Sequence, residues 1–320
     1  MEVENRNNNN IGIGSSALPE EFKICPYMKI GYVSLNVWDV QRSIEFYQSV
    51  LGFSLIGKAS KDRALLSSKG DESHLVELVS AKKDNNGDTR SEGGAALKRA
   101  GLYHFAILLP ERKYLADMLV NASQNKDKVH FEGLADHLVS EAIYIRDPDF
   151  NGVEIYCDRP NSEWKWSTNN RLQVATLPLR TDDLLGEATV GGWKGIPART
   201  RIGHVHLHVR YLANAMRFYH EVLGLNLTTT FPGAYFFAAN NYHHHIAVNS
   251  WLGMHIGAPC SDCVGLNHFG IELPNKQGYE NTVNRLARYK IEPQQREDLQ
   301  ESRSVFVQDS DGITMRIYYV

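Results

Sequence analysis

The sequence contains an internal repeat, and this repeat restricts the folds that are open to the chain. Residues 31–37 read GYVSLNV and recur as GHVHLHV at 203–209. Farther along, LYHFAILLP at 102–110 aligns with LNHFGIELP at 266–274. Matches in the same order over such long stretches indicate that the two halves of the chain are copies of one structural plan.

Each half is in turn two units of one plan, a strand followed by a helix and three further strands. In the first unit, Tyr32 to Val37 alternate as a strand does, and the next apolar residues follow a helical period until Gly52 ends the helix. Strand-like stretches follow at 54–58, 64–67 and 74–79. Four units are predicted in all, at 28–80, 101–158, 201–251 and 265–320.

The repeat also predicts the domain organisation of an α+β protein. An N-terminal domain is expected at 28–160 and a C-terminal domain at 201–320, each with two units. Residues 161–200 link them and are expected to hold a short helix near Thr181 to Gly186. Residues 1–27 are rich in Asn, Gly, Ser and Glu, a composition that predicts a disordered tail.

Composition excludes several kinds of partner. A formal net charge of -3 argues against nucleic acid or an anionic membrane as the main partner. The longest apolar runs have the length of strands and are too short to cross a bilayer. The N-terminus lacks the apolar core of a signal peptide, so we expect a cytoplasmic protein.

The cysteines predict neither a disulfide framework nor a complete metal site. The chain has four, which is few for its length. Cys260 and Cys263 have the spacing of half a zinc knuckle, but no second pair completes it. We therefore expect two ordinary thiols in a loop.

One segment contains a histidine, a tyrosine and a carboxylate that suggest a chemical function. His137 and Tyr144 precede an Asp147-Pro148-Asp149 turn, and Glu154 follows it. This order and spacing resemble the signature of the type I extradiol ring-cleaving dioxygenases, non-haem iron enzymes that open catechol rings with O2. The resemblance implies that Glu154 is an iron ligand and that His137 and Tyr144 lie beside the substrate. Phe150 stands where the signature usually has glycine.

The four units resemble the vicinal oxygen chelate superfamily over almost all of residues 28–320. That resemblance implies a fold of four βαβββ units, paired into two cup-shaped half-barrels with a metal on the floor. It also implies ligand positions at the start of a unit's first strand and in the middle of its last strand. From unit one to unit four, these positions hold Tyr32 and Glu77, His104 and Glu154, His204 and approximately Asn249, and His268 and Arg316.

These residues decide which units can share a metal. Ordinary extradiol enzymes pair units three and four, which here would place the cation Arg316 at the carboxylate position. Units two and three give His104, His204 and Glu154, the two-histidine, one-carboxylate set of O2-activating iron(II) enzymes. We therefore predict an active cup that spans the two halves, or units exchanged between halves or subunits. The cup of units one and four is expected to be structural, and for His268 both a hydrogen-bonded role and a ligand role stay open.

A run of three histidines supplies the candidate acid/base. His244 matches the position of the extradiol acid/base best, and strand phase leaves His243 and His245 open. His206 and His208 share a strand face with His204 and could replace or support it. Four nearby aromatic residues could line an apolar pocket or belong to the core: Phe231, Tyr235, Phe237 and Trp251.

The resemblance implies an extradiol dioxygenase of the catechol 2,3-dioxygenase type, similar to those of Bacillus. It would use Fe(II), with Mn(II) as the alternative ion, and a catechol-type substrate with O2. His244 would take a phenolic proton, and His137 and Tyr144 would donate hydrogen bonds to bound oxygens. The product would be of the hydroxymuconic-semialdehyde type. The alternatives are a glyoxalase-like metal-dependent isomerase or lyase and a non-catalytic protein that binds an aromatic ligand. Proteins of the superfamily commonly pair, so the resemblance also implies a possible homo-oligomer.

Overall fold

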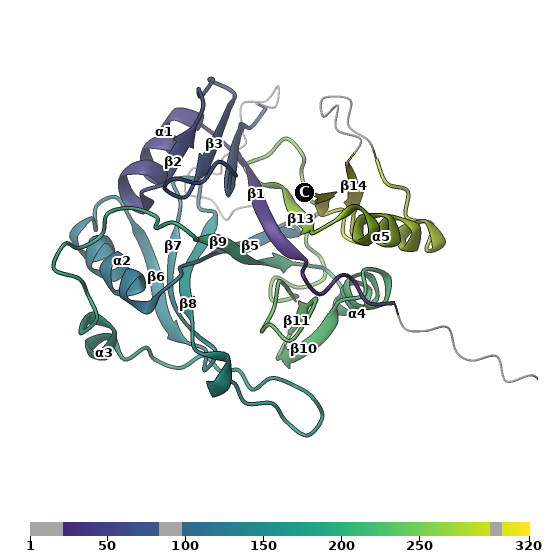
Figure 1. The fold of residues 1–320 in the computed structure, drawn as a ribbon. Coiled ribbons are helices and arrows are strands. Elements are labelled where there is room, and N and C mark those ends of the chain that lie inside the picture. Colours follow the sequence, from purple (N-terminus) through teal and green to yellow (C-terminus); the bar gives the residue numbers. More distant parts are fainter. Residues whose placement is uncertain (1–21, 83–97, 295–302) are drawn as a thin grey trace, which may run out of the picture.

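The strands of the chain form two mixed sheets. The computed structural model describes residues 22–82, 98–294 and 303–320. Within them, one sheet has eight strands and the other has seven. Helices α1 (Val40–Phe46) and α2 (Arg112–Gln124) lie on one side of the molecule, and α4 (Leu212–Met216) and α5 (Lys276–Arg288) lie on the other (Figure 1). The α+β class predicted from the sequence is confirmed.

The eight-stranded sheet takes one unit from each half of the chain. Its order is β10-β11-β12-β9-β5-β8-β7-β6, so the second and third units join at its centre. There β5 and β9 run antiparallel, with His104 opposite His206 and Ala106 opposite His204. Its strands are β5 (Gly101–Leu108), β6 (His130–Asp136), β7 (Ser140–Arg146), β8 (Gly152–Asp158), β9 (Arg201–His208), β10 (Asn226–Phe231), β11 (Ala234–Ala238) and β12 (Ile246–Asn249).

The seven-stranded sheet joins the first and fourth units in the order β14-β15-β13-β1-β4-β3-β2. The predicted pairing of units two and three, and of one and four, is therefore confirmed. Because each sheet takes a unit from both halves, the assignment of 28–160 and 201–320 as domains stays a prediction. The strands are β1 (Lys29–Val37), β2 (Ser54–Ile56), β3 (Arg63–Ser67), β4 (Val76–Ser80), β13 (Gly265–Leu273), β14 (Ser304–Gln308) and β15 (Thr314–Tyr319).

The first helix forms where the sequence predicts it. Asp39 caps it by accepting the N–H of Arg42, and α1 (Val40–Phe46) continues as a π-helical turn, η1 (Tyr47–Leu51). Gly52 ends it with φ 78° and packs against Gly195 so closely that a Cβ would clash. The other helical segments are α2 (Arg112–Gln124), η2 (Asn161–Glu163), α3 (Thr181–Leu185), α4 (Leu212–Met216), η3 (Arg217–Val222) and α5 (Lys276–Arg288). The expected linker helix is thus α3.

Aspartates in the repeated Asp-x-Asp turn hold the two units of each half together. In the first half, Asp147 accepts the hydroxyl of Tyr47 at 3.1 Å, and Asp149 pairs with Arg42. In the second half, the same roles fall to the pairs Asp309–Tyr219, at 2.8 Å, and Asp311–Arg210, at 2.5 Å. Sheets therefore join units across the halves, while these polar contacts join units within a half.

The turn before Glu154 keeps a glycine-like conformation without the glycine. Phe150 has φ 64°, in the left-handed region that side chains disfavour. At the matching position of the second half stands Gly312, with φ 91°. The repeat thus retains the backbone shape, and Phe150 holds it at a cost in strain.

Two expectations need correction. Residues 1–21 of the predicted tail lie outside the described residues, but Ile24 is buried and donates its N–H to the carbonyl of Gly224 at 3.2 Å. The packed part of the chain therefore begins before residue 28. Cys260 and Cys263 are not free thiols, because they form a disulfide with a Cα–Cα distance of 5.3 Å.

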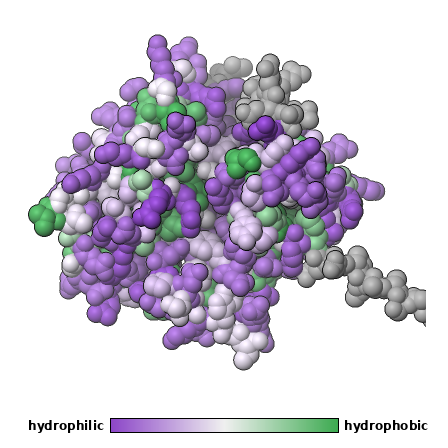
Figure 2. Space-filling view, viewed as in Figure 1, coloured by the Kyte–Doolittle hydropathy of each residue, from purple (hydrophilic) through white to green (hydrophobic). Residues whose placement is uncertain are grey.

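The surface is polar on the side that Figure 2 shows. The face shown in Figure 2 is mostly hydrophilic, with scattered hydrophobic residues. Among the described residues, no helix is long and apolar enough to cross a membrane.

Candidate metal centre and its cavity

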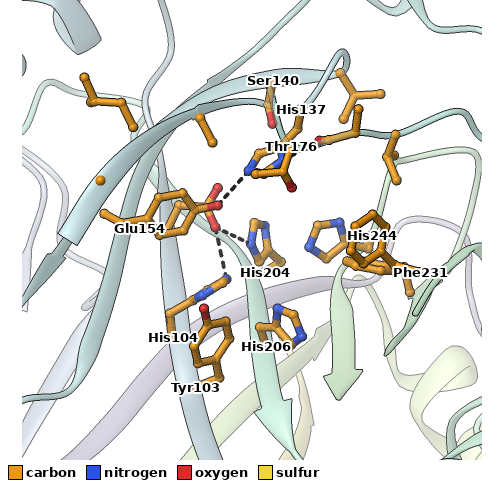
Figure 3. Close-up of a pocket in the computed structure, with 18 of the residues that line it drawn as sticks. Tyr103, His104, His137, Ser140, Glu154, Thr176, His204, His206, Phe231 and His244 are labelled. Carbon is orange, nitrogen blue, oxygen red and sulfur yellow. Dashed lines mark hydrogen bonds and ion pairs between the residues drawn. The ribbon is translucent and has the colours of Figure 1, made fainter. Parts of the chain in front are cut away.

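Three predicted ligands meet at the centre of the eight-stranded sheet. The Nε2 atoms of His104 and His204 lie 3.0 and 3.1 Å from the same oxygen, Oε2 of Glu154 (Figure 3). One ligand atom from each residue lies within 4.8 Å of the other two, and all three side chains are buried. The structure therefore brings together the set that sequence analysis proposed from units two and three.

The register of three strands explains this convergence. Glu154 on β8 and His204 on β9 both lie beside Ala106 of β5, one on each side. His104 is two residues before Ala106 and shares its face of the sheet, since side chains alternate along a strand. The small Ala106 side chain sits between the larger ones. Local strand geometry thus aims three ligands from distant parts of the sequence at one point.

The charges at this point suit a cation. Burial raises the pKa of Glu154, but His204 and His104 outweigh burial and hold that pKa well below its usual range. Burial lowers the pKa of His204 to about 4. Near pH 7 the carboxylate is therefore ionised and the His204 imidazole is neutral, which are the forms in which these side chains bind metal. The donor set fits a divalent transition metal such as iron.

Unit three offers no second carboxylate to this centre. The position equivalent to Glu154 lies beside His206, two residues after His204, and the register places Ala247 there. From the sequence, this position was predicted at approximately Asn249. Asn249 instead lies beside His208, and its side chain bonds His206 and His208 at 3.0 and 2.7 Å. Those two histidines are therefore held by Asn249 and stand outside the cluster of three ligands.

A cavity of about 460 Å³ opens beside the three ligands. Phe231 and Trp251 line it, as sequence analysis allowed, together with Tyr103, Phe236 and part of the linker, residues 174–176. Tyr235 and Phe237 do not line it. Alternation along β11 turns Phe236 to the cavity and its two neighbours away, and Phe237 packs against Tyr219 of η3 in the core.

His137 and Tyr144 both line this cavity and bond each other. Nε2 of His137 lies 2.8 Å from the Tyr144 hydroxyl, and Nδ1 lies 2.8 Å from the carbonyl of Ala175 in the linker. A carbonyl only accepts, so Nδ1 carries a hydrogen, and an Nε2 without a hydrogen accepts from the Tyr144 hydroxyl. Burial raises the pKa of Tyr144 well above its usual range, so its hydroxyl stays protonated.

Of the three consecutive histidines, only His244 lines the cavity (Figure 3). Its ring centroid is 4.0 Å from that of His204. His243 lies behind it, with Nε2 3.0 Å from Asp158, and Nδ1 of His245 accepts the N–H of Ala239. Burial lowers the pKa of His244 well below its usual range, so its imidazole is neutral. Position thus favours His244 over its two neighbours as the group that meets a substrate.

Sequence reasoning missed Tyr103, Phe236, Asp158 and the linker as parts of the site. Tyr103 directly precedes a predicted ligand, and Phe236 follows from strand phase once β11 is placed, so local signals existed for both. Contact between Asp158 and His243 joins residues far apart in the sequence and depends on the pairing of units. No sequence motif indicates it.

Comparison with known proteins identifies the family. A sequence model of the Glyoxalase/Bleomycin resistance protein/Dioxygenase superfamily matches residues 29–155 and 201–317. The chain belongs to this superfamily. A member from Bacillus subtilis (strain 168), named catechol-2,3-dioxygenase, is 35% identical over 267 residues, which cover 82% of this chain and 90% of that protein. This relative supports an oxidoreductase of the dioxygenase type, as the sequence predicted.

Two solved structures share the fold. A protein from Bacillus subtilis subsp. subtilis str. 168 has a TM-score of 0.58 and 12% identity, covering 91% of this chain and 84% of that one. Glyoxalase I from Zea mays has a TM-score of 0.52 and 14% identity, and the match covers 91% of this chain and 92% of that one. At such identities the likeness concerns the fold alone, so the chemistry must be argued from the site.

The other cup of this superfamily member has a different polar centre. The Tyr32 hydroxyl and Nε2 of His268 lie 2.9 Å apart, and Arg63 pairs with Glu77 at 2.6 Å. No group of potential metal ligands converges there among the described residues. The structural role of that cup stays a prediction.

Proposed function

We propose that the protein is an extradiol dioxygenase that opens a catechol-type ring with O2 at a mononuclear Fe(II) site. His104, His204 and Glu154 would hold the ion. The observation that carries the proposal is their buried convergence beside an aromatic-lined cavity. Such a facial set of ligands leaves open positions for a chelating diol and for oxygen. The 35% identical catechol-2,3-dioxygenase of Bacillus subtilis supports the same chemistry.

An iron(II) ion held by these residues would supply the redox chemistry with O2, and Mn(II) is the alternative ion for the same donors. The protein's part is to bind the ring, keep water out and handle protons. Phe231, Phe236 and Trp251 give the cavity apolar surface for an aromatic ring. His244 faces the same cavity as a neutral imidazole and would accept a phenolic proton.

Of His137 and Tyr144, the donor toward a reacting oxygen would be the Tyr144 hydroxyl, after it turns away from Nε2 of His137, because the Nδ1 hydrogen of His137 is donated to the Ala175 carbonyl. The linker carbonyl of Ala175 fixes the His137 ring, and the Tyr144 hydroxyl stays protonated because it is buried. A preorganised donor in a buried site stabilises developing negative charge at little reorganisation cost. A glyoxalase-like lyase would need a further carboxylate from unit three, where Ala247 stands, so no observation favours that alternative.

Anaerobic reconstitution tests this proposal. The purified chain is loaded with Fe(II), or with Mn(II) in a parallel sample, and then mixed with catechol and O2. We expect a yellow ring-cleavage product, followed by its absorbance, and consumption of one O2 per ring. Absence of product from every catechol tested, with metal bound, would refute the dioxygenase assignment.

Iron content tests which cup holds the metal. Glu154→Ala should abolish stoichiometric iron, while the matched variant His268→Ala in the other cup should keep it. Metal analysis after desalting gives the answer without any assay of activity. Loss of iron only in His268→Ala would show that the other cup is the metal site.

A further inference from the structure

We propose that Asp158 and His243 are positioning residues that fix the tautomer of His244, so that its bare Nε2 faces the cavity as a base. The inference rests on the proposed function, in which His244 accepts a phenolic proton. Its structural core is a chain of hydrogen bonds from the end of β8 to the cavity, and none of these bonds requires a bound ion.

The chain has two links. His243 is 1% exposed in its side chain, and its Nε2 lies 3.0 Å from Oδ1 of Asp158. Nδ1 of the same ring lies 2.7 Å from Nδ1 of His244. His244 then lines the cavity and stacks near His204, 4.0 Å between ring centroids. Both ring nitrogens of His243 are therefore occupied, and only one nitrogen of His244 is left for a substrate.

Counting donors settles the direction of each bond. An ionised carboxylate only accepts, so Nε2 of His243 must carry the hydrogen that it shares with Asp158. A neutral imidazole has one N–H, so Nδ1 of His243 is then an acceptor. His244 must in turn donate from Nδ1, which leaves its Nε2 without a hydrogen. That is the tautomer a general base needs toward the cavity.

Asp158 is itself held in place. The Tyr242 hydroxyl lies 3.2 and 3.0 Å from its two carboxylate oxygens and donates to them. Tyr156, fully buried on the same strand as Glu154, lies 2.7 Å from that hydroxyl and donates to it in turn. Tyr242 thus holds the carboxylate directly and Tyr156 supports Tyr242, and together they set the orientation of the group that His243 faces.

A shared ion is the competing explanation for this cluster, because His204, His243 and His244 also lie close enough to offer ligands to one metal. The 2.7 Å between the two Nδ1 atoms is a hydrogen-bond distance. Two nitrogens bound at about 2.1 Å to one tetrahedral ion would stand farther apart than this. In addition, the other nitrogen of His243 is already engaged by Asp158. The geometry therefore favours a hydrogen-bonded pair.

The proton step balances within this chain. The O–H bond of a catechol hydroxyl breaks, its proton moves to Nε2 of His244, and the catecholate oxygen keeps the electron pair. His244 becomes an imidazolium that still donates from Nδ1 to His243. The positive charge is then met through His243 by the Asp158 carboxylate, and the proton returns from Nε2 to the product at a later step.

The first test needs no activity and no variant. Full-length protein labelled with ¹⁵N-histidine is examined by NMR, which distinguishes protonated from bare ring nitrogens. We expect His244 to show a protonated Nδ1 and a bare Nε2, and His243 the reverse arrangement. A hydrogen on Nε2 of His244 would overturn the inference, whatever reaction the protein catalyses.

Asp158→Asn provides the second test, because it is nearly isosteric and reverses the direction of the hydrogen bonds in the chain. The Asn oxygen can still accept from Tyr242, while its amide faces His243 and donates. His243 would then donate from Nδ1, and His244 would turn its N–H to the cavity. We expect this reversed pattern in NMR and a fall in kcat of about 100-fold or more, with KM and iron content unchanged.

A matched control removes a carboxylate that lies elsewhere. Asp262→Asn changes a half-exposed side chain whose partner is Lys82, and kcat should stay near the wild-type value. Full kcat in Asp158→Asn, together with a reversed tautomer, would overturn the inference while leaving the dioxygenase assignment intact. Failure of the wild-type protein to cleave any catechol would instead refute the proposed function, and the NMR result would still decide the tautomer.

Discussion

Replacing Asp309 by asparagine should make the protein more stable at pH 8 and leave its stability at pH 4 nearly unchanged. Burial raises the pKa of Asp309 from 3.8 to about 6. Its Oδ1 accepts the N–H groups of Asp311 and Ile313, both at 2.9 Å, and its Oδ2 accepts the Tyr219 hydroxyl. Asparagine can keep both bonds at Oδ1 and turn its amide toward the tyrosine oxygen.

The sign follows from linkage. Between pH 3.8 and about 6 the folded chain holds a proton that the unfolded chain has released, so stability falls as pH rises through this window. A shift of this size corresponds to about 3 kcal/mol at 1.36 kcal/mol for each pKa unit. Asparagine mimics the protonated form at every pH. The gain in unfolding free energy should therefore approach about 3 kcal/mol at pH 8 and fall below about 1 kcal/mol at pH 4.

Urea denaturation followed by tryptophan fluorescence at both pH values measures this difference. Asp147→Asn is the matched control, since burial raises that pKa to about 6 as well. Oδ2 of Asp147 accepts from both Asn151 and Tyr47, so a new amide there would face another donor. We expect the same pH dependence at a lower stability. If the effect of Asp309→Asn did not change between pH 4 and pH 8, the raised pKa would be refuted.

Three further predictions concern the turn, a buried thiol and the site. Phe150→Gly should raise the unfolding free energy by about 1 kcal/mol, because it relieves a left-handed φ, while Gly312→Ala should lower it; urea curves measure both. Burial raises the pKa of Cys157 to about 12, so iodoacetamide at pH 8 should label it only after unfolding, as mass spectrometry would show. Tyr144→Phe should lower kcat roughly tenfold or more and leave iron content unchanged, and unaltered kcat would argue against its hydrogen bond to bound oxygen.

The pairing of units could be predicted from the sequence because of the charge on one residue, Arg316. Arg316 at a ligand position repels a metal ion, and this excluded the ordinary pairing of units three and four. The two candidate histidine ligands and Glu154 followed from the remaining positions. Strand alternation then placed most of the site, because it depends only on neighbours in sequence.

The rest depended on contacts that the sequence does not encode locally. Whether Ala247 or Asn249 lies at the ligand position of unit three depends on how far the preceding loop shifts β12 along β9. The disulfide between Cys260 and Cys263 depends on a backbone path that brings their Cα atoms to 5.3 Å. Contact between Asp158 and His243 exists only because units two and three form one sheet.

The two cups share one backbone register and differ in charge. In the cup of units two and three, His204 and Glu154 lie on either side of Ala106, and His104 is two residues before Ala106. In the cup of units one and four, Tyr32 and Arg316 lie on either side of Gly270, and His268 is two residues before Gly270.

The three ligand positions therefore map one to one, and only the histidine is retained in the second cup. A single Arg316→Glu change would restore the carboxylate but leave Tyr32, a phenol that burial keeps protonated with a pKa of about 12, in place of the second imidazole. Glu77 of β4 lies beside Ser34, two residues after Tyr32, and its charge is already paired with Arg63. Metal binding in the cup of units one and four would thus require at least two coordinated changes, so the same backbone geometry can carry the proposed metal site in one cup and not in the other.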